Sequence, residues 1–378
     1  MLTVLVPAHN EGTKQKTIKV RDRVLIDGFY EKAIVEQVVT IDPPLLETLN
    51  SLRSQSVQVD RIVVIADNCT DDTAGIALGQ GVEVFTTIDN RFKKAGGLNQ
   101  WLDENLSSLA PNDQVMVMDA DSVLDQNFVM HAQKFIADGY HAVGGVFLGK
   151  PGGGLVGMLQ RNEYARYARD VERKDGKTLV LTGTATIFTV ACLNHVIEGR
   201  KSGKIPGGIE GKAQVYDTKA LTEDNELTFA LLHLGYKIIA PAECALKTEV
   251  METWGSLWRQ RDRWKRGAIE NNVHYGITRV TAKYWGLQVW GFLGILATLA
   301  YLGTLGYSVS GGSMHFHTLW IGVTVVYIVE RFITVRKRGW RQMCISAILV
   351  VEMPYDLLLQ AVHVKALCAA TFRTQQNW

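Results

Sequence analysis

Two acidic side chains in this 378-residue chain stand where they could hold a cation. The sequence MDADS (118–122) places Asp119 and Asp121 two positions apart where an apolar run ends, so a turn there brings both carboxylates to one pocket. Oxygen ligands of this type suit Mg²⁺ or Mn²⁺, which also bridge to phosphate. The pair therefore predicts a divalent cation site, while a solvated acidic turn remains the alternative.

The N-terminal part of the chain alternates apolar runs with helical stretches. The apolar runs, rich in Val and Ile, are 2–8, 61–67, 82–87 and 114–120, and the helical stretches between them are 43–55, 71–80 and 94–106. Buried strands that alternate with helices predict an α/β fold with a mostly parallel sheet covered on both faces.

Polar side chains follow the apolar runs. Asn10 and Glu11 come after the first run, Asp67 ends the second, and Asp119 and Asp121 follow the last. Because ligands of parallel sheets bind beyond the carboxyl ends of the strands, we expect these side chains at one ligand-binding edge.

Residues 13–41 interrupt the alternation. Polar and β-branched residues alternate there around Asp27-Gly28, which is typical of a β-hairpin. We interpret the segment as an insertion between the first strand and its helix. A surface addition and an acceptor-binding flap both remain open.

The composition excludes several classes of protein. Hydrophobic residues make up 47% and charged residues 21%, which excludes a disordered chain. The formal net charge is only +2, so no basic field favours a nucleic-acid partner. The five cysteines form no CxxC pair, so neither a zinc site nor a disulfide framework is predicted.

The apolar residues are concentrated toward the C-terminus. Residues 284–329 contain no Asp, Glu, Lys or Arg. Since one bilayer span needs about 20 apolar residues, the run predicts two transmembrane helices, at about 285–307 and 317–335. The expected protein is therefore a multi-pass protein of the cell or inner membrane that contacts membrane lipids.

Basic residues predict the orientation of these spans. The turn between the spans has no Lys or Arg, whereas 336–338 are all basic, so the positive-inside rule makes residues 1–275 cytoplasmic. A third apolar segment, 342–364, is interrupted by Glu352 and Pro354, and its topology stays open because a carboxylate at mid-depth is costly.

A stretch rich in Trp and Arg precedes the spans. Residues 253–275 place Trp254, Trp258, Arg261 and Trp264 at helical spacings. Such a helix is expected to lie at the membrane surface, where Trp anchors it and Arg meets lipid phosphate.

Seven ordered elements carry a resemblance to a known family. They are VLVPAHNE (4–11), VVIADNCTDDT (63–73), KAGGLN (94–99), MDADS (118–122), TGTATIF (182–188), LTEDNELTFALLHLGYKI (221–238) and QRDRW (260–264). Over about residues 1–275 the chain resembles the family 2 glycosyltransferases. It is most similar to their membrane-bound D, D, D, QxxRW branch, which includes cellulose, chitin and hyaluronan synthases and ceramide glucosyltransferases.

The resemblance implies a GT-A type domain that binds a nucleotide sugar, followed by transmembrane helices within 284–378. Asp67 would bind the base or ribose of a UDP-sugar, and Asp121, with Asp119 beside it, would hold Mg²⁺ or Mn²⁺ on the diphosphate. The implied donor-binding residues are Pro7, Asn10, Glu11, Asp67, Lys94, Gly96, Asp119, Gln260 and Arg263.

The resemblance also implies an acceptor site and a general base. Asp224 in TED would take the proton of the acceptor hydroxyl as that oxygen attacks from the face opposite UDP, with inversion. A first-turn helix charge is a second role for the same residue. The implied acceptor-binding residues are Gly183, Thr184, Glu223 and Trp264.

The acceptor remains open between a lipid-linked glycan and a growing polysaccharide. Three apolar segments make a poor tunnel, which favours transfer of one or a few sugars to a lipid. A processive synthase would need a homo-oligomer to build one. A nucleotidyl- or phosphotransferase and a non-catalytic membrane scaffold are the alternatives from other classes.

Overall fold

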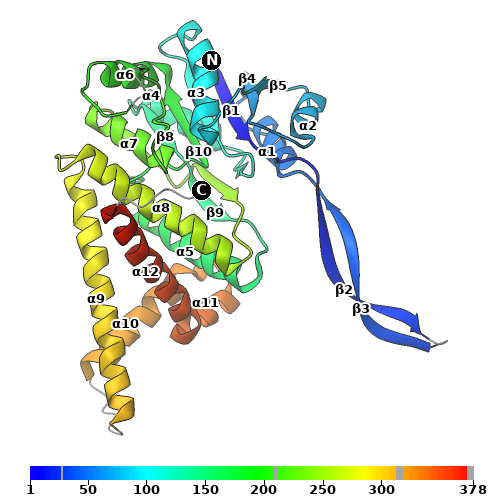
Figure 1. The fold of residues 1–378 in the computed structure, drawn as a ribbon, viewed down its shortest axis with the longest axis vertical. Coiled ribbons are helices and arrows are strands. Elements are labelled where there is room, and N and C mark those ends of the chain that lie inside the picture. The colour runs from blue at the N-terminus through cyan, green and yellow to red at the C-terminus, as the bar shows by residue number, and fades with distance from the viewer. Residues whose placement is uncertain (27–28, 208–211, 312–317, 373–378) are drawn as a thin grey trace.

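The computed structural model describes residues 1–26, 29–207, 212–311 and 318–372. A seven-stranded sheet of order β11-β8-β10-β6-β1-β4-β5 forms its centre (Figure 1). Its strands are β1 (Leu2–Ala8), β4 (Arg61–Ala66), β5 (Glu83–Thr86), β6 (Gln114–Met118), β8 (Ala142–Gly144), β10 (Ala185–Thr189) and β11 (Ile238–Ile239). Only β10 pairs antiparallel with its neighbours, β6 and β8, so the predicted mostly parallel sheet is confirmed.

Helices cover both faces of this sheet. One face carries α1 (Pro44–Arg53), α2 (Thr73–Gly79) and α4 (Phe128–Ala137), and the other carries α3 (Lys93–Asn105) with η1 (Leu106–Ser108), α6 (Val190–Lys201) and α7 (Glu223–His233). Successive side chains of a strand point to opposite faces. Val4 therefore joins the core that contains α1, while Leu5 joins the core that contains α3. Burial on both faces explains why these strands are apolar throughout.

A second, three-stranded sheet of order β7-β12-β9 leads into two long helices. Its strands are β7 (Val123–Leu124), β9 (Val146–Gly149) and β12 (Ala245–Thr248). Helix α5 (Gly154–Arg173) follows β9, and α8 (Trp254–Tyr275) follows β12. Helix α8 begins after Thr253, whose hydroxyl accepts a hydrogen bond from the backbone N–H of Ser256 at 3.1 Å.

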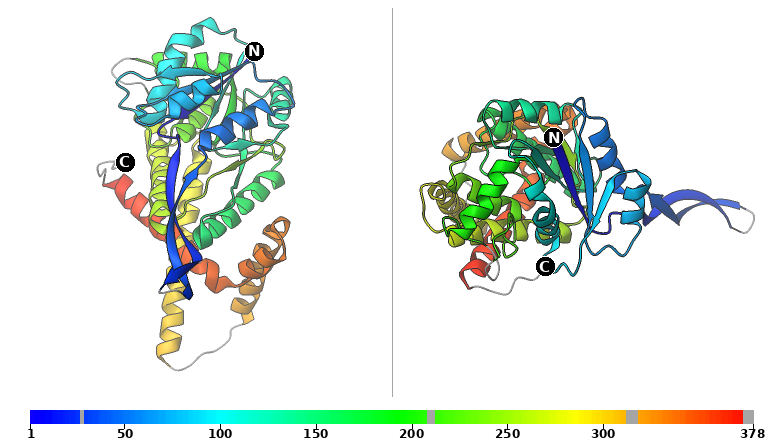
Figure 2. Two further views of the ribbon diagram at one scale, coloured as in Figure 1. Left: turned by 90° about the vertical axis from the view of Figure 1, so that its right-hand side faces the viewer. Right: turned by 90° about the horizontal axis from the view of Figure 1, so that it is seen from above.

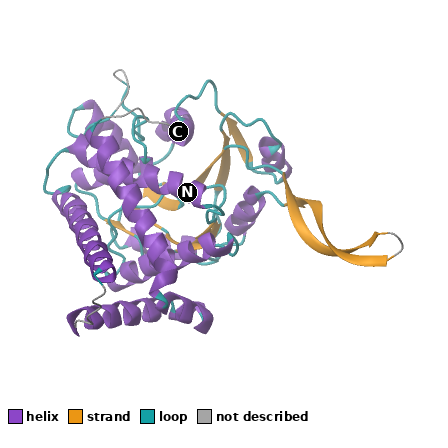
Figure 3. Ribbon diagram, turned by 60° about the horizontal axis from the view of Figure 1, so that its bottom comes forward, coloured by secondary structure: helices purple, strands orange, loops and turns teal. Residues whose placement is uncertain are grey.

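The inserted segment forms a long hairpin. Strands β2 (Lys14–Ile26) and β3 (Phe29–Ile41) pair antiparallel in one unbroken register, from Lys14 opposite Ile41 to Ile26 opposite Phe29. The hairpin extends away from the rest of the chain (Figures 1 and 3). The predicted turn at Asp27-Gly28 lies outside the described residues.

The C-terminal region is helical. It consists of α9 (Ala282–Ser310), α10 (Thr318–Thr334), η2 (Arg336–Arg338), α11 (Trp340–Ala347) and α12 (Leu349–Thr371). In the part of the chain that the structure describes, α9 alone is long and apolar enough to cross a bilayer, and its side chains are mostly exposed. The multi-pass topology therefore stays a prediction.

The third apolar segment packs against the N-terminal region, and α12 runs beside α8 and α5 (Figure 2). Glu352 of α12 is 1% exposed. Its carboxylate accepts hydrogen bonds from Asn162 at 2.8 Å and from Arg166 at 3.0 Å, and it also pairs with Arg331 of α10. Partners on α5 and α10 thus compensate the charge that interrupts this segment.

Candidate functional site

A cavity of about 660 Å³ lies beside the carboxyl end of β6. The turn after β6, helix α5, the loop before β10, the start of α7 and helix α8 all contribute to its lining. Ten of the predicted site residues line it: Lys94, Asp119, Asp121, Gly183, Thr184, Glu223, Asp224, Gln260, Arg263 and Trp264.

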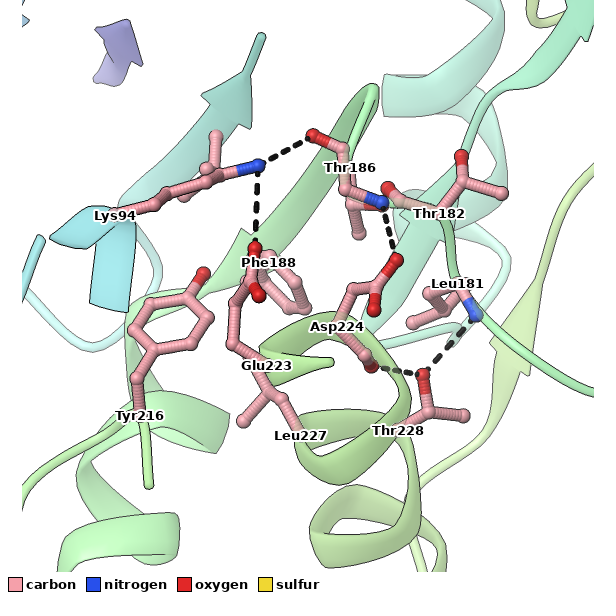
Figure 4. Close-up of a pocket in the computed structure, with 12 residues that line it drawn as sticks. Lys94, Leu181, Thr182, Thr186, Phe188, Tyr216, Glu223, Asp224, Leu227 and Thr228 are labelled. Atoms are coloured by element: carbon pink, nitrogen blue, oxygen red, sulfur yellow. Dashed lines mark hydrogen bonds and ion pairs between the residues drawn. The ribbon is translucent and has the colours of Figure 1, made fainter. Parts of the chain in front are cut away.

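Asp224 lies in the first turn of α7, facing the loop that contains Gly183 (Figure 4). Its Oδ2 accepts a hydrogen bond from the backbone N–H of Gly183 at 2.9 Å, and its Oδ1 accepts one from that of Asn225 at 2.7 Å. Burial, reinforced by the neighbouring Glu223, raises the pKa of Asp224 to about 6. This carboxylate is therefore ionised at neutral pH and close to the pKa range that suits a general base.

Lys94 pairs with the carboxylates beside Asp224. Its Nζ lies 2.5 Å from Asp119 Oδ1 and 3.5 Å from Glu223 Oε1, and it donates to the carbonyl of Gly183 at 3.1 Å. Burial by itself lowers the pKa of Lys94, but the two carboxylates outweigh burial and raise the pKa above its usual range. The ammonium therefore stays charged and ties α3 to the loop that contains Gly183.

Asp121 is partly buried close to other carboxylates, whose effect on its pKa exceeds that of Lys150. Its Oδ1 accepts from Ser122 Oγ at 3.3 Å and from Thr248 Oγ1 at 3.4 Å. Burial, together with Glu249 and Glu11, raises the pKa of Asp121. Since anionic oxygens that repel one another are stabilised by a bound cation, this arrangement fits a divalent metal.

The protein ligands for such a metal are few. No group of three or more His, Cys, Asp or Glu side chains suited to a metal occurs among the described residues. Mg²⁺ typically binds one or two carboxylates and completes its shell with water and substrate phosphate. Asp121, with Asp119 beside it, fits that pattern.

A second group of predicted residues lies outside the cavity lining. Asp67 is 7% exposed at the end of β4, and its Oδ1 accepts from Asn90 at 2.7 Å and from Thr87 at 2.9 Å. A Cβ on Gly96 would lie 2.0 Å from Oδ1 of Asn90, so Gly96 leaves room for a neighbouring side chain. Asp67 does not line this cavity, although β1, β4 and β6 are adjacent parallel strands whose carboxyl ends lie at one edge of the sheet.

The turn after β1 packs against the turn after β4. Asn10, at φ 56°, accepts a hydrogen bond on Oδ1 from the backbone N–H of Thr70 at 2.8 Å. The backbone N–H of Glu11 donates to Thr73 Oγ1 at 2.9 Å. Pro7 pairs with Ile65 in the sheet. Pro7, Asn10 and Glu11 are likewise absent from the cavity lining, although Glu11 is near enough to act on Asp121.

The QRDRW segment lies within α8. Gln260, Arg263 and Trp264 line the cavity, whereas Trp254 is 39% exposed. Burial and then the charge of Arg263 lower the pKa of Lys93, so Arg263 lies near the start of α3. Helix α8 therefore brings a cation and an aromatic ring to the cavity.

Comparison with known proteins identifies the family. The model of the family described as "Glycosyltransferase like family 2" matches residues 38–267. The chain belongs to glycosyltransferase family 2. The predicted family is thus confirmed, and the protein is a glycosyltransferase.

Relatives of this glycosyltransferase include polysaccharide synthases. It is 26% identical over 274 residues to the poly-beta-1,6-N-acetyl-D-glucosamine synthase of Staphylococcus aureus. The similar region covers 68% of this chain and 60% of the relative. It is 28% identical over 303 residues to the probable glycosyltransferase YdaM of Bacillus subtilis, covering 76% and 58%. The chain thus spans less than two thirds of each relative. The first of them is named as a polysaccharide synthase.

A solved structure supports the GT-A type fold. The mannosyltransferase PcManGT from Pyrobaculum calidifontis, solved in complex with GDP-Man and Mn²⁺, is similar with a TM-score of 0.59 and 16% identity. The similarity covers 99% of the present glycosyltransferase and 88% of that chain.

The cavity also contains residues that the sequence analysis missed. Phe147 of β9 stacks on Tyr167 with ring centroids 4.8 Å apart, and it meets Tyr164 edge-on at 4.7 Å. Tyr164 and Tyr167 lie three positions apart on α5, a spacing that places them on one helix face. That spacing is the only sequence signal for this aromatic wall of the glycosyltransferase.

Proposed function

We propose that this glycosyltransferase transfers a sugar, with inversion, from a UDP-sugar to a hydroxyl of a lipid-linked or growing polysaccharide acceptor at the cytoplasmic membrane face. The observation that carries the proposal is that Asp121, Asp224 and Arg263 border one cavity. A metal-binding carboxylate, a basic carboxylate and a cation for phosphate are the groups that such a transfer needs.

In the proposed mechanism, Asp224 receives the proton of the acceptor hydroxyl. The hydroxyl oxygen forms a bond to the anomeric carbon as the bond from that carbon to the UDP oxygen breaks. The backbone N–H of Gly183 holds the carboxylate in place. Attack from the face opposite UDP inverts the anomeric carbon.

Charged groups in the cavity would meet the diphosphate. Arg263 and Gln260 are placed to bind its oxygens, and Asp121 with Asp119 would hold Mg²⁺ or Mn²⁺. A bound divalent cation supplies Lewis-acid stabilisation of the leaving diphosphate. Lys94 pairs with Asp119 and Glu223, while burial and Glu223 raise the pKa of Asp224 and make it the better proton acceptor.

Aromatic and apolar side chains support the proposed acceptor and the proposed location at the membrane. Trp264 and the aromatic wall of Phe147, Tyr164 and Tyr167 suit the apolar faces of sugar rings. Exposed apolar side chains along α9 suit lipid contact. The synthase relative from Staphylococcus aureus favours a processive polysaccharide synthase as the second candidate.

A donor panel tests the proposal. Purified full-length enzyme with Mn²⁺ or Mg²⁺ would receive radiolabelled UDP-sugars and, because the structural neighbour binds GDP-Man, GDP-mannose as well. We expect nucleotide release with a UDP-sugar only, and product sizing separates single from repeated transfer. Release from GDP-mannose alone would contradict the UDP assignment.

A further inference from the structure

Arg261, the second residue of QRDRW, does not lie at the surface. It is 2% exposed and extends from α8 toward α5 and α12, so the expectation that arginine of this helix meets lipid phosphate is wrong for Arg261. It is also absent from the cavity lining. Any effect of this side chain on the reaction must therefore pass through its neighbours.

Besides Tyr164, whose ring centroid lies 5.6 Å from the guanidinium, two neighbours of Arg261 on its own helix line the cavity, Gln260 and Trp264. The Nη1 of Arg261 donates to Oε1 of Gln260 at 2.7 Å. With that oxygen engaged, the amide NH₂ of Gln260 remains as the donor for an anionic ligand. The guanidinium lies 4.3 Å from the ring centroid of Trp264 and so covers one face of the indole. A ligand in the cavity can therefore contact only the other face and the edge of the Trp264 ring.

The opposite side of Arg261 is anchored. Its Nη2 donates to Glu163 of α5 at 2.7 Å, and the hydroxyl of Tyr355 on α12 donates to the same carboxylate. Tyr355 is 1% exposed. The chain of contacts therefore runs from the C-terminal helix through Glu163 to the guanidinium, and from there to the two cavity residues.

Resting on the proposed function, we infer that Arg261 is a positioning residue. It presents the amide N–H groups of Gln260 to the donor diphosphate and one face of Trp264 to the acceptor sugar, and Glu163 with Tyr355 makes this geometry depend on α12. A purely structural ion pair needs neither the contact to Gln260 nor the stacking on Trp264. The Nε of Arg261 is buried without a hydrogen-bond partner in the described chain. The guanidinium therefore keeps its contacts to Gln260 and Trp264 although one of its donors stays unpaired.

The experiment compares Arg261→Lys with Arg259→Lys in the purified full chain. Lysine keeps the charge but cannot donate in two directions while stacking on an indole. Arg259 is exposed on the same helix and serves as the matched control. We expect Arg261→Lys to raise KM for donor and acceptor roughly 10- to 100-fold, as misplaced binding groups do, and Arg259→Lys to match the wild type.

The kinetic constants separate positioning from stability. A merely structural role lowers the folded fraction, which reduces apparent kcat and leaves both KM values unchanged, and that result overturns the inference. If Arg261→Lys does not fold, the same kinetics are measured on Tyr355→Phe, which removes only the hydroxyl that binds Glu163. Raised KM values for this variant support the inference, and wild-type KM values overturn it. A wild type inactive with every donor contradicts the proposed function and this inference with it, whereas an active wild type with unchanged variants contradicts the inference alone.

Discussion

The backbone N–H of Gly183 donates to Oδ2 of Asp224 at 2.9 Å, which fixes the carboxylate at the cavity wall. The other oxygen of Asp224 accepts from the N–H of Asn225. Two backbone N–H groups thus orient the carboxylate, so Asp224→Asn keeps the shape of the side chain but replaces one of the two accepting oxygens with an amide donor.

Asp224→Asn keeps the shape and removes the base. We expect kcat to fall on the order of 10²- to 10⁴-fold, the usual contribution of a general base. Donor binding, measured by isothermal titration with UDP, should persist. Asp138→Asn, at the exposed end of α4, is the control and should retain full activity. Normal turnover by Asp224→Asn would remove the base assignment.

The pH dependence follows from the raised pKa of Asp224, about 6. Below that pH the carboxyl is protonated and cannot accept a proton, so kcat/KM should fall as the pH drops through 6 and level off above it. Because Glu223 contributes to raising this pKa, Glu223→Gln should move the acidic limb to lower pH. A limb that stays in place shows that Glu223 does not act on the titrating group.

Asp121→Asn should separate stability from activity. It removes the charge whose burial, together with repulsion by Glu249 and Glu11, raises the pKa of Asp121, so the Tm without metal should be unchanged or higher. The Mn²⁺ concentration for half-maximal activity should rise roughly tenfold or more. Excess EDTA should stop the wild-type enzyme and added Mn²⁺ should restore it. Unchanged rates in EDTA would exclude the metal role.

Two glycines test the packing beside Asp67. A Cβ on Gly96 would lie 2.0 Å from Asn90, whereas one on Gly75 would meet no atom within 4 Å. Gly96→Ala should therefore destabilise the fold by roughly 1–3 kcal/mol. Gly75→Ala, inside α2, should stabilise it by about 0.5–1 kcal/mol. Denaturant unfolding measures both, and equal effects would contradict the close contact.

Glu352→Gln tests the attachment of α12. Removing this charge leaves Arg166 and Arg331 without their shared carboxylate. The free energy of unfolding should fall by about 3–5 kcal/mol. Thermal unfolding in detergent should show a lower Tm. Glu330→Gln is the control, since that carboxylate is half exposed, and it should change the Tm little. Equal Tm values for both variants would show that the Glu352 network is not needed.

Local patterns in the sequence predicted much of the secondary structure. The alternation of apolar runs and helices predicted β1, β4, β5 and β6, because strand and helix periodicities are properties of neighbouring residues. The same patterns predicted where α8 lies. A pattern could not show that α12 packs beside α8, since that contact depends on how distant segments cross.

The candidate site divides in the same way. The sequence by itself determined the chemical groups, namely the paired acids of MDADS, the TED carboxylate and the QRDRW cation, because each is a short local motif. Only the tertiary structure decided that Asp121, Asp224 and Arg263 share a cavity while Asp67 does not, and that Arg261 is buried. The burial of a side chain and the charges around it depend on segments that are distant in the sequence. The packing of β6, α7 and α8 therefore decides which charged groups act on one another.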